Sequence, residues 1–124
     1  MSGLPAIHLA RAYEIPEHAR GYRVLVDRLW PRGVKKDDLA LDAWLKDVAP
    51  SDALRRWFNH QAARWDEFRE RYMQELHGKT GAIDELLDVA RRQPVLLIYG
   101  SRDVEHNNAV VLRDFLVKRL SARP

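Results

Sequence analysis

The stretch Val95-Leu96-Leu97-Ile98-Tyr99 decides the fold class of this chain. Five consecutive apolar residues are typical of a strand that is covered on both faces, as the strands of parallel sheets are. A second stretch, Tyr22 to Asp27, has an apolar, β-branched centre and predicts another largely buried strand. Ile7 to Tyr13 predicts a short strand that begins the fold, and Glu14 to Gly21 leaves room for only a helical turn or loop.

Five further segments carry apolar residues at helical spacing and are predicted to be helices. The predicted N-terminal caps are Ser51 for the second segment, Thr80 for the fourth and Asp103 for the last. The first segment is predicted to end before Ala49-Pro50, and the third at Gly78. Their apolar positions are, in chain order, Leu41, Trp44, Leu45 and Val48; Leu54, Trp57 and Phe58; Trp65, Phe68, Tyr72 and Leu76; Ile83, Leu86, Leu87 and Ala90; and Ala109, Val110, Leu112, Phe115 and Leu116. We expect four large residues of these stripes to be largely buried, namely Trp57, Trp65, Phe68 and Leu86.

This order of strands and helices predicts an α/β fold with a small, mostly parallel sheet covered by helices, because long helical connections favour parallel pairing. The 124 residues are the size of one typical domain, and no Gly/Ser linker or repeat divides them. We therefore expect a single domain over residues 1–124, with an ordered core over about 6–120.

Composition narrows the classes of protein. The chain has no cysteine, which excludes disulfides and thiolate chemistry. No secretory signal or membrane-length apolar run is apparent, so we expect a cytoplasmic protein without a membrane partner. The net charge of +3 arises from 21 basic and 18 acidic residues that are interspersed, which argues against a dedicated nucleic-acid binder.

The first segment that could carry chemistry is Asp27-Arg28-Leu29-Trp30-Pro31-Arg32-Gly33. A carboxylate ends a buried strand, and two arginines flank a rigid Trp-Pro turn. Arginine matches carboxylates and phosphates with its fork of donors, and Trp30 could stack on a base or sugar ring. The alternative is internal: Asp27 pairs with Arg28 or Arg32, and Trp30 belongs to the core.

The second segment is Ser101 to Asn107, which joins a buried strand to the last helix. Arg102 would face a ligand crevice, Asp103 would cap the helix or bind substrate, and His106 could exchange a proton near neutral pH or simply lie on the surface. Ligands of parallel α/β sheets bind beyond the carboxyl ends of the strands. Both segments lie at that end, so we expect them to converge.

Other kinds of site find little support. His8, His18, His60 and His77 show no metal-ligand spacing, and we expect neither a metal nor a cofactor. No glycine-rich dinucleotide or P-loop motif is present. Ser101 after Gly100 only faintly resembles a nucleophile turn, because the second glycine is absent.

Three stretches resemble a known family: Tyr22 to Gly33, Ala49 to Phe58, and Asp103 to Ala109. They are similar to the YeaO-like branch of domain-of-unknown-function family 488, and the similarity extends over about residues 6–118. The resemblance implies a Rossmann-like, three-layer α/β domain from the cytoplasm of bacteria and archaea, with no established activity. A longer branch of that family has a Cys-His-Arg triplet where this chain has Asn107-Asn108-Ala109, so thiol chemistry does not carry over.

We interpret these residues as the site of an anionic ligand, phosphorylated or nucleotide-like, with hydrolase or transferase activity left open. Arg28, Arg32 and Arg102 would hold the anion. Asp27 would orient a hydroxyl or act as a base, and His106 would carry a proton. The predicted substrate-binding residues are Arg28, Trp30, Arg32, Arg102, Asp103 and Asn107, and the predicted catalytic residues are Asp27 and His106.

Two alternatives remain open. One is a regulatory or protein-interaction module without catalysis, which an exposed apolar patch would mark. The other is a weak nucleic-acid binder that uses Arg28, Arg32, Lys35 and Lys36, with an affinity that falls steeply as salt is raised. The sequence does not specify the oligomeric state.

Overall fold

The computed structural model describes residues 7–17 and 19–122, which contain a four-stranded, all-parallel sheet of order β1-β4-β2-β3. The strands are β1 (Ile7–Arg11), β2 (Tyr22–Leu25), β3 (Ala43–Trp44) and β4 (Val95–Tyr99). The central strand β4 pairs on both sides, since Ile7 and Tyr22 both lie opposite Val95. The predicted α/β class with a parallel sheet is confirmed.

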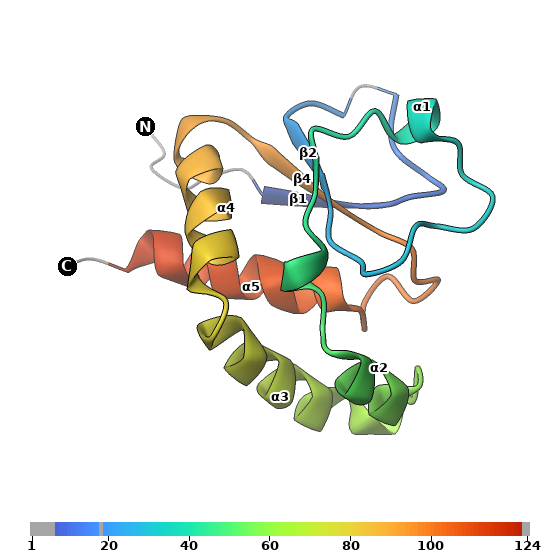
Figure 1. The fold of residues 1–124 in the computed structure, drawn as a ribbon, viewed down its shortest axis with the longest axis vertical. Coiled ribbons are helices and arrows are strands. Elements are labelled where there is room, and N and C mark those ends of the chain that lie inside the picture. Colours follow the sequence, from blue (N-terminus) through green and yellow to red (C-terminus); the bar gives the residue numbers. More distant parts are fainter. Residues whose placement is uncertain (1–6, 18, 123–124) are drawn as a thin grey trace.

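The helices fall on the two faces of this sheet in unequal numbers (Figure 1). Helices α2 (Asp52–Phe58), α3 (Trp65–His77), α4 (Thr80–Arg92) and α5 (Asn108–Ser121) lie on one side. The short α1 (Lys36–Leu39) and the loops around it lie on the other. Among the residues described, no helix is both long and apolar enough to cross a membrane.

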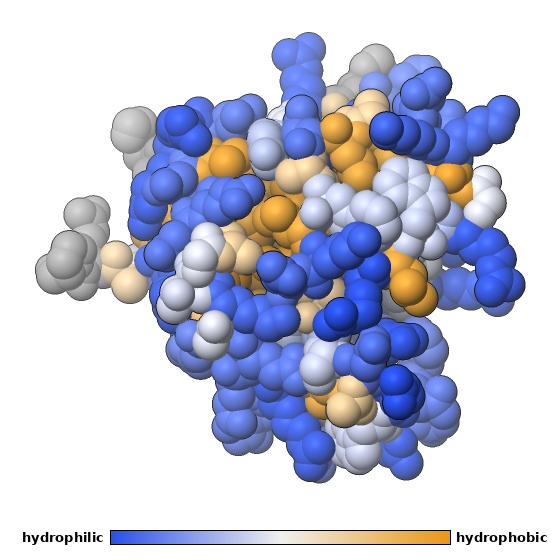
Figure 2. Space-filling model, viewed as in Figure 1, coloured by the Kyte–Doolittle hydropathy of each residue, from blue (hydrophilic) through white to orange (hydrophobic). Residues whose placement is uncertain are grey.

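Two apolar clusters fill the space on either side of the sheet. The larger one packs Leu97 of β4 against the helical layer, including Leu112 of α5. The smaller one packs Leu96 and Ile98 of β4 against Leu39 on the loop side. Alternate residues of β4 thus enter opposite clusters, which explains why the whole strand is apolar. Figure 2 shows hydrophilic side chains over most of the face seen in Figure 1.

The helix predicted around Leu41 to Val48 is wrong. The structure has the two-residue strand β3 there, followed by a 3₁₀ turn, η1 (Lys46–Val48). Backbone pairing with β2 decides this: Asp42 N donates to the Arg23 carbonyl at 2.9 Å, and Leu45 N donates to the Leu25 carbonyl at 3.0 Å. The apolar positions of this segment are compatible with an edge strand as well as with a helix.

The predicted helix ends are partly right. Ser51 caps α2 through a bond from Leu54 N at 3.2 Å, and Gly78 is the C-terminal cap of α3, as predicted. The prediction that Thr80 caps α4 is wrong, because Thr80 is the first residue of that helix. Lys79 occupies the cap position and makes no side-chain capping bond.

The burial of the helical stripes follows the prediction for two of four large residues. Phe68 and Leu86 are buried, whereas Trp57 and Trp65 are only half-buried. Trp57 lies at the surface beneath the guanidinium groups of Arg64 and Arg71, 5.3 and 4.7 Å from its ring centre. Its apolar spacing therefore reflects stacking with cations as well as packing in the core.

Gly21 makes the turn into β2 and lies tightly against Pro94, the residue that precedes β4. Its φ of +116° lies in a region that side-chain-bearing residues rarely adopt. A Cβ atom placed there would lie 2.5 Å from the carbonyl oxygen of Pro94. Tyr22 N donates to that same oxygen at 2.9 Å, so this contact aligns β2 with β4.

Candidate functional site

The loops that follow β2 and β4 meet at one edge of the sheet, as expected from the sequence. Gly100 N, directly after β4, donates to Asp27 Oδ2 at 2.8 Å. Val26 N donates to the Ile98 carbonyl at 3.0 Å and continues the β2–β4 pairing up to this point. The carboxylate of Asp27 therefore stands at the carboxyl end of the sheet, where ligands of such folds bind.

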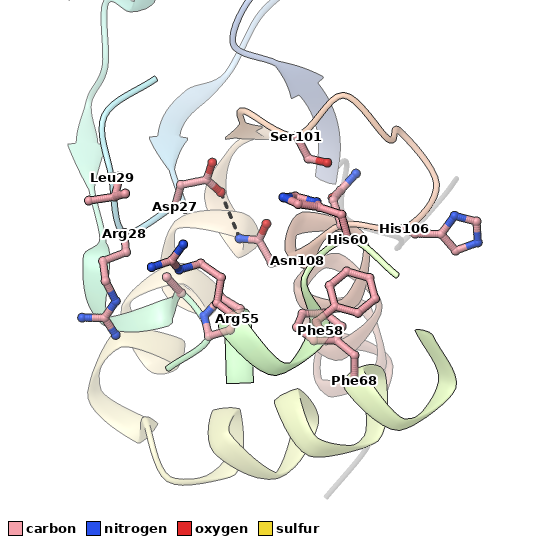
Figure 3. A pocket seen from close by; sticks show the side chains of 13 residues that line it. Asp27, Arg28, Leu29, Arg55, Phe58, His60, Phe68, Ser101, His106 and Asn108 are labelled. Atoms are coloured by element: carbon pink, nitrogen blue, oxygen red, sulfur yellow. Dashed lines mark hydrogen bonds between the residues drawn. The ribbon is translucent and has the colours of Figure 1, made fainter. Parts of the chain in front are cut away.

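Asn108, the first residue of α5, holds the other oxygen of this carboxylate. Its Nδ2 donates to Asp27 Oδ1 at 3.1 Å and to the Val26 carbonyl at 3.1 Å (Figure 3). Asp27 is thus fixed by two donors from β4 and α5. A carboxylate accepts about four hydrogen bonds, so capacity remains for a ligand.

The pKa of Asp27 is raised, because burial disfavours the charged carboxylate more than its bonds from Gly100 and Asn108 favour it. Tyr72 of α3 lies below the same group, fully buried, and donates its hydroxyl to the Val48 carbonyl. Burial, and next the charge of Asp27, raise the pKa of Tyr72, which keeps this phenol neutral.

A pocket of about 210 Å³ opens in front of Asp27. Its apolar floor includes Phe58 and Phe68, whose rings stack at 4.4 Å between centres. The residues that line it are Asp27, Arg28, Leu29, Ala49, Pro50, Arg55, Phe58, His60, Phe68, Ser101, His106, Asn107 and Asn108. The β2 loop, the end of α2 and the β4–α5 loop therefore build one cavity.

Two arginines share a single carboxylate at one side of this pocket. Asp52 Oδ1 lies 3.3 Å from Arg28 Nε and 3.4 Å from Arg55 Nη2. Arg28 Nε is buried yet has no acceptor in hydrogen-bond geometry. Figure 3 shows both arginines on the same side of the pocket as Asp27. Since one carboxylate faces two guanidinium groups, Asp52 cannot satisfy all of their N–H donors, and Arg28 Nε is left without an acceptor.

The β4–α5 loop is organised by Asp103. Its Oδ1 accepts from the backbone of Glu105 and of His106, both at 2.9 Å, and its Oδ2 lies 3.0 Å from His106 Nδ1. The bond from Glu105 N is the leading cause of a lowered pKa at Asp103. The His106 ring also lies edge-on to Trp65 at 5.1 Å and points away from Asp27 (Figure 3).

Asn107, and not Asp103, caps α5, so the predicted cap is wrong. Asn107 Oδ1 accepts from Val110 N at 3.1 Å, and its Nδ2 donates to the Asp103 carbonyl at 2.8 Å. The helix begins at Asn108, four residues later than a cap at Asp103 would require. Asn107 is 3% exposed, so its lining of the pocket is a small part of its surface.

The structure brings together some predicted site residues and leaves others apart. Asp27, Arg28, His106 and Asn107 line the pocket described above. Arg102 and Asp103 line a neighbouring pocket.

Trp30 and Arg32 lie elsewhere. The Trp30 indole donates to the Val34 carbonyl at 2.7 Å and packs edge-on against Trp44 in the loop-side cluster. Arg32 is exposed, and its carbonyl accepts from the Tyr13 hydroxyl at 2.9 Å. This turn therefore supports the loop, while Asp27 and Arg28 face the pocket.

Arg55, His60 and Asn108 were missed as site residues from the sequence. Arg55 lies in the middle of α2 and His60 just beyond its C-terminal cap, and only the path of the chain from β3 places this helix opposite β2. Asn108 could have been found, since it directly follows the predicted loop from Ser101 to Asn107. The described residues contain no cluster of three or more His, Asp or Glu suited to a metal, and His18 lies outside them.

Comparison with known proteins identifies the family. The family model described as the inactive DUF488-N3 subclade matches residues 6–124. The chain belongs to the DUF488 family. This membership agrees with the resemblance of the Asp27 to Gly33 run.

Two relatives of known sequence illustrate the similarity. The uncharacterised protein YeaO of Escherichia coli K12 is 44% identical over 110 residues, which cover 89% of this chain and 96% of that protein. The uncharacterised protein Rv3073c of Mycobacterium tuberculosis H37Rv is also 44% identical over 110 residues, covering 89% and 92%. No solved structure matches the chain.

Proposed function

We propose that this DUF488 protein binds a small anionic molecule, of the phosphorylated or nucleotide-like class, in the pocket between the β2 and β4 loops. The observation that carries the proposal is the shared carboxylate: Asp52 faces both Arg28 and Arg55, and so leaves guanidinium N–H donors available to a ligand. Arginine forks bind phosphates and carboxylates in pairs of hydrogen bonds.

Asp27 supplies the second half of recognition. Its carboxylate is fixed by Gly100 N and Asn108 Nδ2, and its remaining lone pairs accept from a hydroxyl or ring N–H of the ligand. The stacked Phe58 and Phe68 offer an apolar floor for a ring. Recognition of an anion next to a hydroxyl- or N–H-bearing ring fits sugar phosphates and nucleotides.

We infer that the site binds its ligand without a proton transfer between His106 and Asp27. A proton carrier has to lie within hydrogen-bond reach of the group that it serves. The His106 ring is instead bonded to Asp103 and directed away from Asp27. The description of the matching subclade as inactive supports the same reading.

Arg55→Met is expected to abolish most ligand binding without unfolding the protein, because the Arg55 side chain is about half exposed and bonds only locally to Asp52. Loss of a charge-assisted hydrogen bond weakens affinity by about tenfold or more. Thermal shift with inorganic phosphate, ribose 5-phosphate and adenosine 5′-monophosphate measures this, since ligands of the folded state raise the melting temperature.

Arg56→Met is the matched control, because Arg56 is exposed on the same helix and does not line the pocket. It should retain the full shift of the parent protein. Arg28→Lys should lose the shift as Arg55→Met does, since lysine lacks the fork. Equal shifts in all four proteins, or no shift with any of the three anions at millimolar concentration, would contradict the proposed function.

A further inference from the structure

A second pocket, of about 420 Å³, adjoins the first on the side of the β4–α5 loop. Its lining residues are Phe58, His60, Gly100, Ser101, Arg102, Asp103 and His106. Phe58, His60, Ser101 and His106 also line the first pocket. The two cavities are therefore neighbouring compartments with shared walls.

Size supports one site with two compartments. Pockets for drug-sized ligands measure roughly 300–1,000 Å³. The first compartment alone, at about 210 Å³, falls below this range. With the second compartment the site falls within it. The loop between them is anchored from β1, because Arg11 Nε donates to the Ser101 carbonyl at 2.9 Å.

The second compartment contains a cation of its own. Arg102 is exposed, and within the described part of the chain it forms no ion pair. Its neighbour Asp103 forms no ion pair with it, since the two oxygens of that carboxylate bond to Glu105 N, His106 N and His106 Nδ1. The site thus has one group of cations, Arg28 and Arg55, in the first compartment and another, Arg102, in the second.

His60 lies where the compartments meet, and its backbone is strained. Asn59 and His60 have φ values of +44° and +53°, two consecutive left-handed residues that are not glycine. Asn59 is the C-terminal cap of α2, where this conformation is common. Gln61 N donates to the Phe58 carbonyl at 2.9 Å, so Asn59 and His60 are the two left-handed residues of a tight turn that directs the His60 side chain.

The His60 ring is free to contact a ligand. Figure 3 shows it beside Ser101, reaching over the pocket. Among residues 7–17 and 19–122 it has no hydrogen-bond partner. Its nearest aromatic neighbour is Phe58, at 6.4 Å between ring centres. An imidazole donates or accepts through either nitrogen, according to its protonation.

We infer that the two compartments bind one ligand with two separated anionic groups, phosphate or carboxylate. One anion lies at Arg28 and Arg55, the other at Arg102, and His60 contacts the ligand between them. This inference rests on the proposed function, which by itself requires only the first anion.

Isothermal titration calorimetry with matched ligands tests the second anion site. The pairs are adenosine 5′-monophosphate against adenosine 3′,5′-bisphosphate, and fructose 6-phosphate against fructose 1,6-bisphosphate. In at least one pair the bisphosphate should bind about tenfold more tightly, as expected for one added charge-assisted contact. Arg102→Met should remove this gain, so that the bisphosphate and its monophosphate bind this variant with similar affinity.

Arg113→Met, an exposed arginine of α5 outside both compartments, should retain the gain. A bisphosphate that binds no more tightly than its monophosphate in either pair overturns the inference, as does a gain that survives Arg102→Met. In those cases a monophosphate affinity that still depends on Arg55 leaves the proposed function standing. If no probe binds, both fail.

The same titration in His60→Gly tests the contact at the junction. Glycine adopts a left-handed conformation freely, so the melting temperature should not fall, while affinity for the bisphosphate should drop several-fold. Asn59→Gly is the control, because it removes the left-handed strain at the adjacent residue and keeps the His60 imidazole. Affinity of His60→Gly equal to that of the parent protein would remove His60 from the site.

Discussion

Gly21→Ala should lower the free energy of unfolding by about 3–5 kcal/mol. Two effects add at this position. Alanine rarely adopts the φ of +116° found here, and its Cβ would lie 2.5 Å from the Pro94 carbonyl oxygen. That oxygen accepts from Tyr22 N, so relief of the clash by moving the backbone would also disturb the pairing of β2 with β4. Urea unfolding followed by circular dichroism measures the change.

Gly81→Ala is the control for this substitution. Gly81 is exposed in α4, and a Cβ atom there would meet nothing within 4 Å. Alanine at a helical position that it fits stabilises by roughly 0.5–1 kcal/mol. Opposite signs for the two variants are therefore expected. A loss below about 1 kcal/mol for Gly21→Ala would show that the turn into β2 adapts to a side chain.

Asn108→Asp should destabilise the protein by about 2–4 kcal/mol at pH 7. The substitution removes the Nδ2 donor that serves Asp27 and the Val26 carbonyl, each at 3.1 Å. It also places a second carboxylate beside Asp27, in surroundings that already raise the pKa of that group by burial. Like charges at this distance cannot both ionise without a penalty.

The pH dependence of this variant has a defined sign. A carboxyl group whose folded-state pKa is raised contributes stability below its unfolded-state pKa, and that contribution is lost as the pH rises through the folded-state pKa. The raised pKa of Asp27 has this direction in the parent protein. The second carboxylate of Asn108→Asp increases this pH dependence. The stability that the variant loses relative to the parent protein should therefore become smaller as the pH falls from 7 toward 4. Urea unfolding at each pH measures the difference.

A second substitution separates charge from shape. Adding Asp27→Asn to the Asn108→Asp protein leaves one carboxylate and one amide at the same two positions, so more than half of the lost stability should return. The double variant should also lose most of the added pH dependence. If it is no more stable than Asn108→Asp alone, repulsion between the carboxylates is not the cause of the deficit.

Local pattern was sufficient where burial and helical period agree. The continuous apolar run of β4 and the stripe of α3 from Trp65 to Leu76 were predictable. In both segments the local sequence pattern and the burial in the fold favour the same secondary structure. The convergence of the β2 and β4 loops was predictable as well, since it follows from parallel pairing. These two results place Asp27 and Arg28 at the pocket.

Other features depend on contacts that no local pattern encodes. β3 is a strand because Asp42 and Leu45 bond to β2, and its two residues carry too little pattern to be recognised. Arg55 and His60 reach the pocket only because the chain returns across the edge of the sheet after β3. The direction of the His106 ring is set by its bond to the Asp103 carboxylate. From the sequence, Asp103 was predicted to be a helix cap instead.

The position of β4 in the sheet also dictates the order in which the fold can form. In the described chain β1 pairs only with β4, and β2 finds no strand partner other than β4 and the two-residue β3. A nascent chain that has not yet reached Val95 thus holds most of its sheet unpaired, with Asp27 still lacking its bond from Gly100. Such late, long-range pairing slows folding and exposes strand edges meanwhile. During synthesis the sheet and the pocket beside Asp27 should accordingly appear together, in one late step.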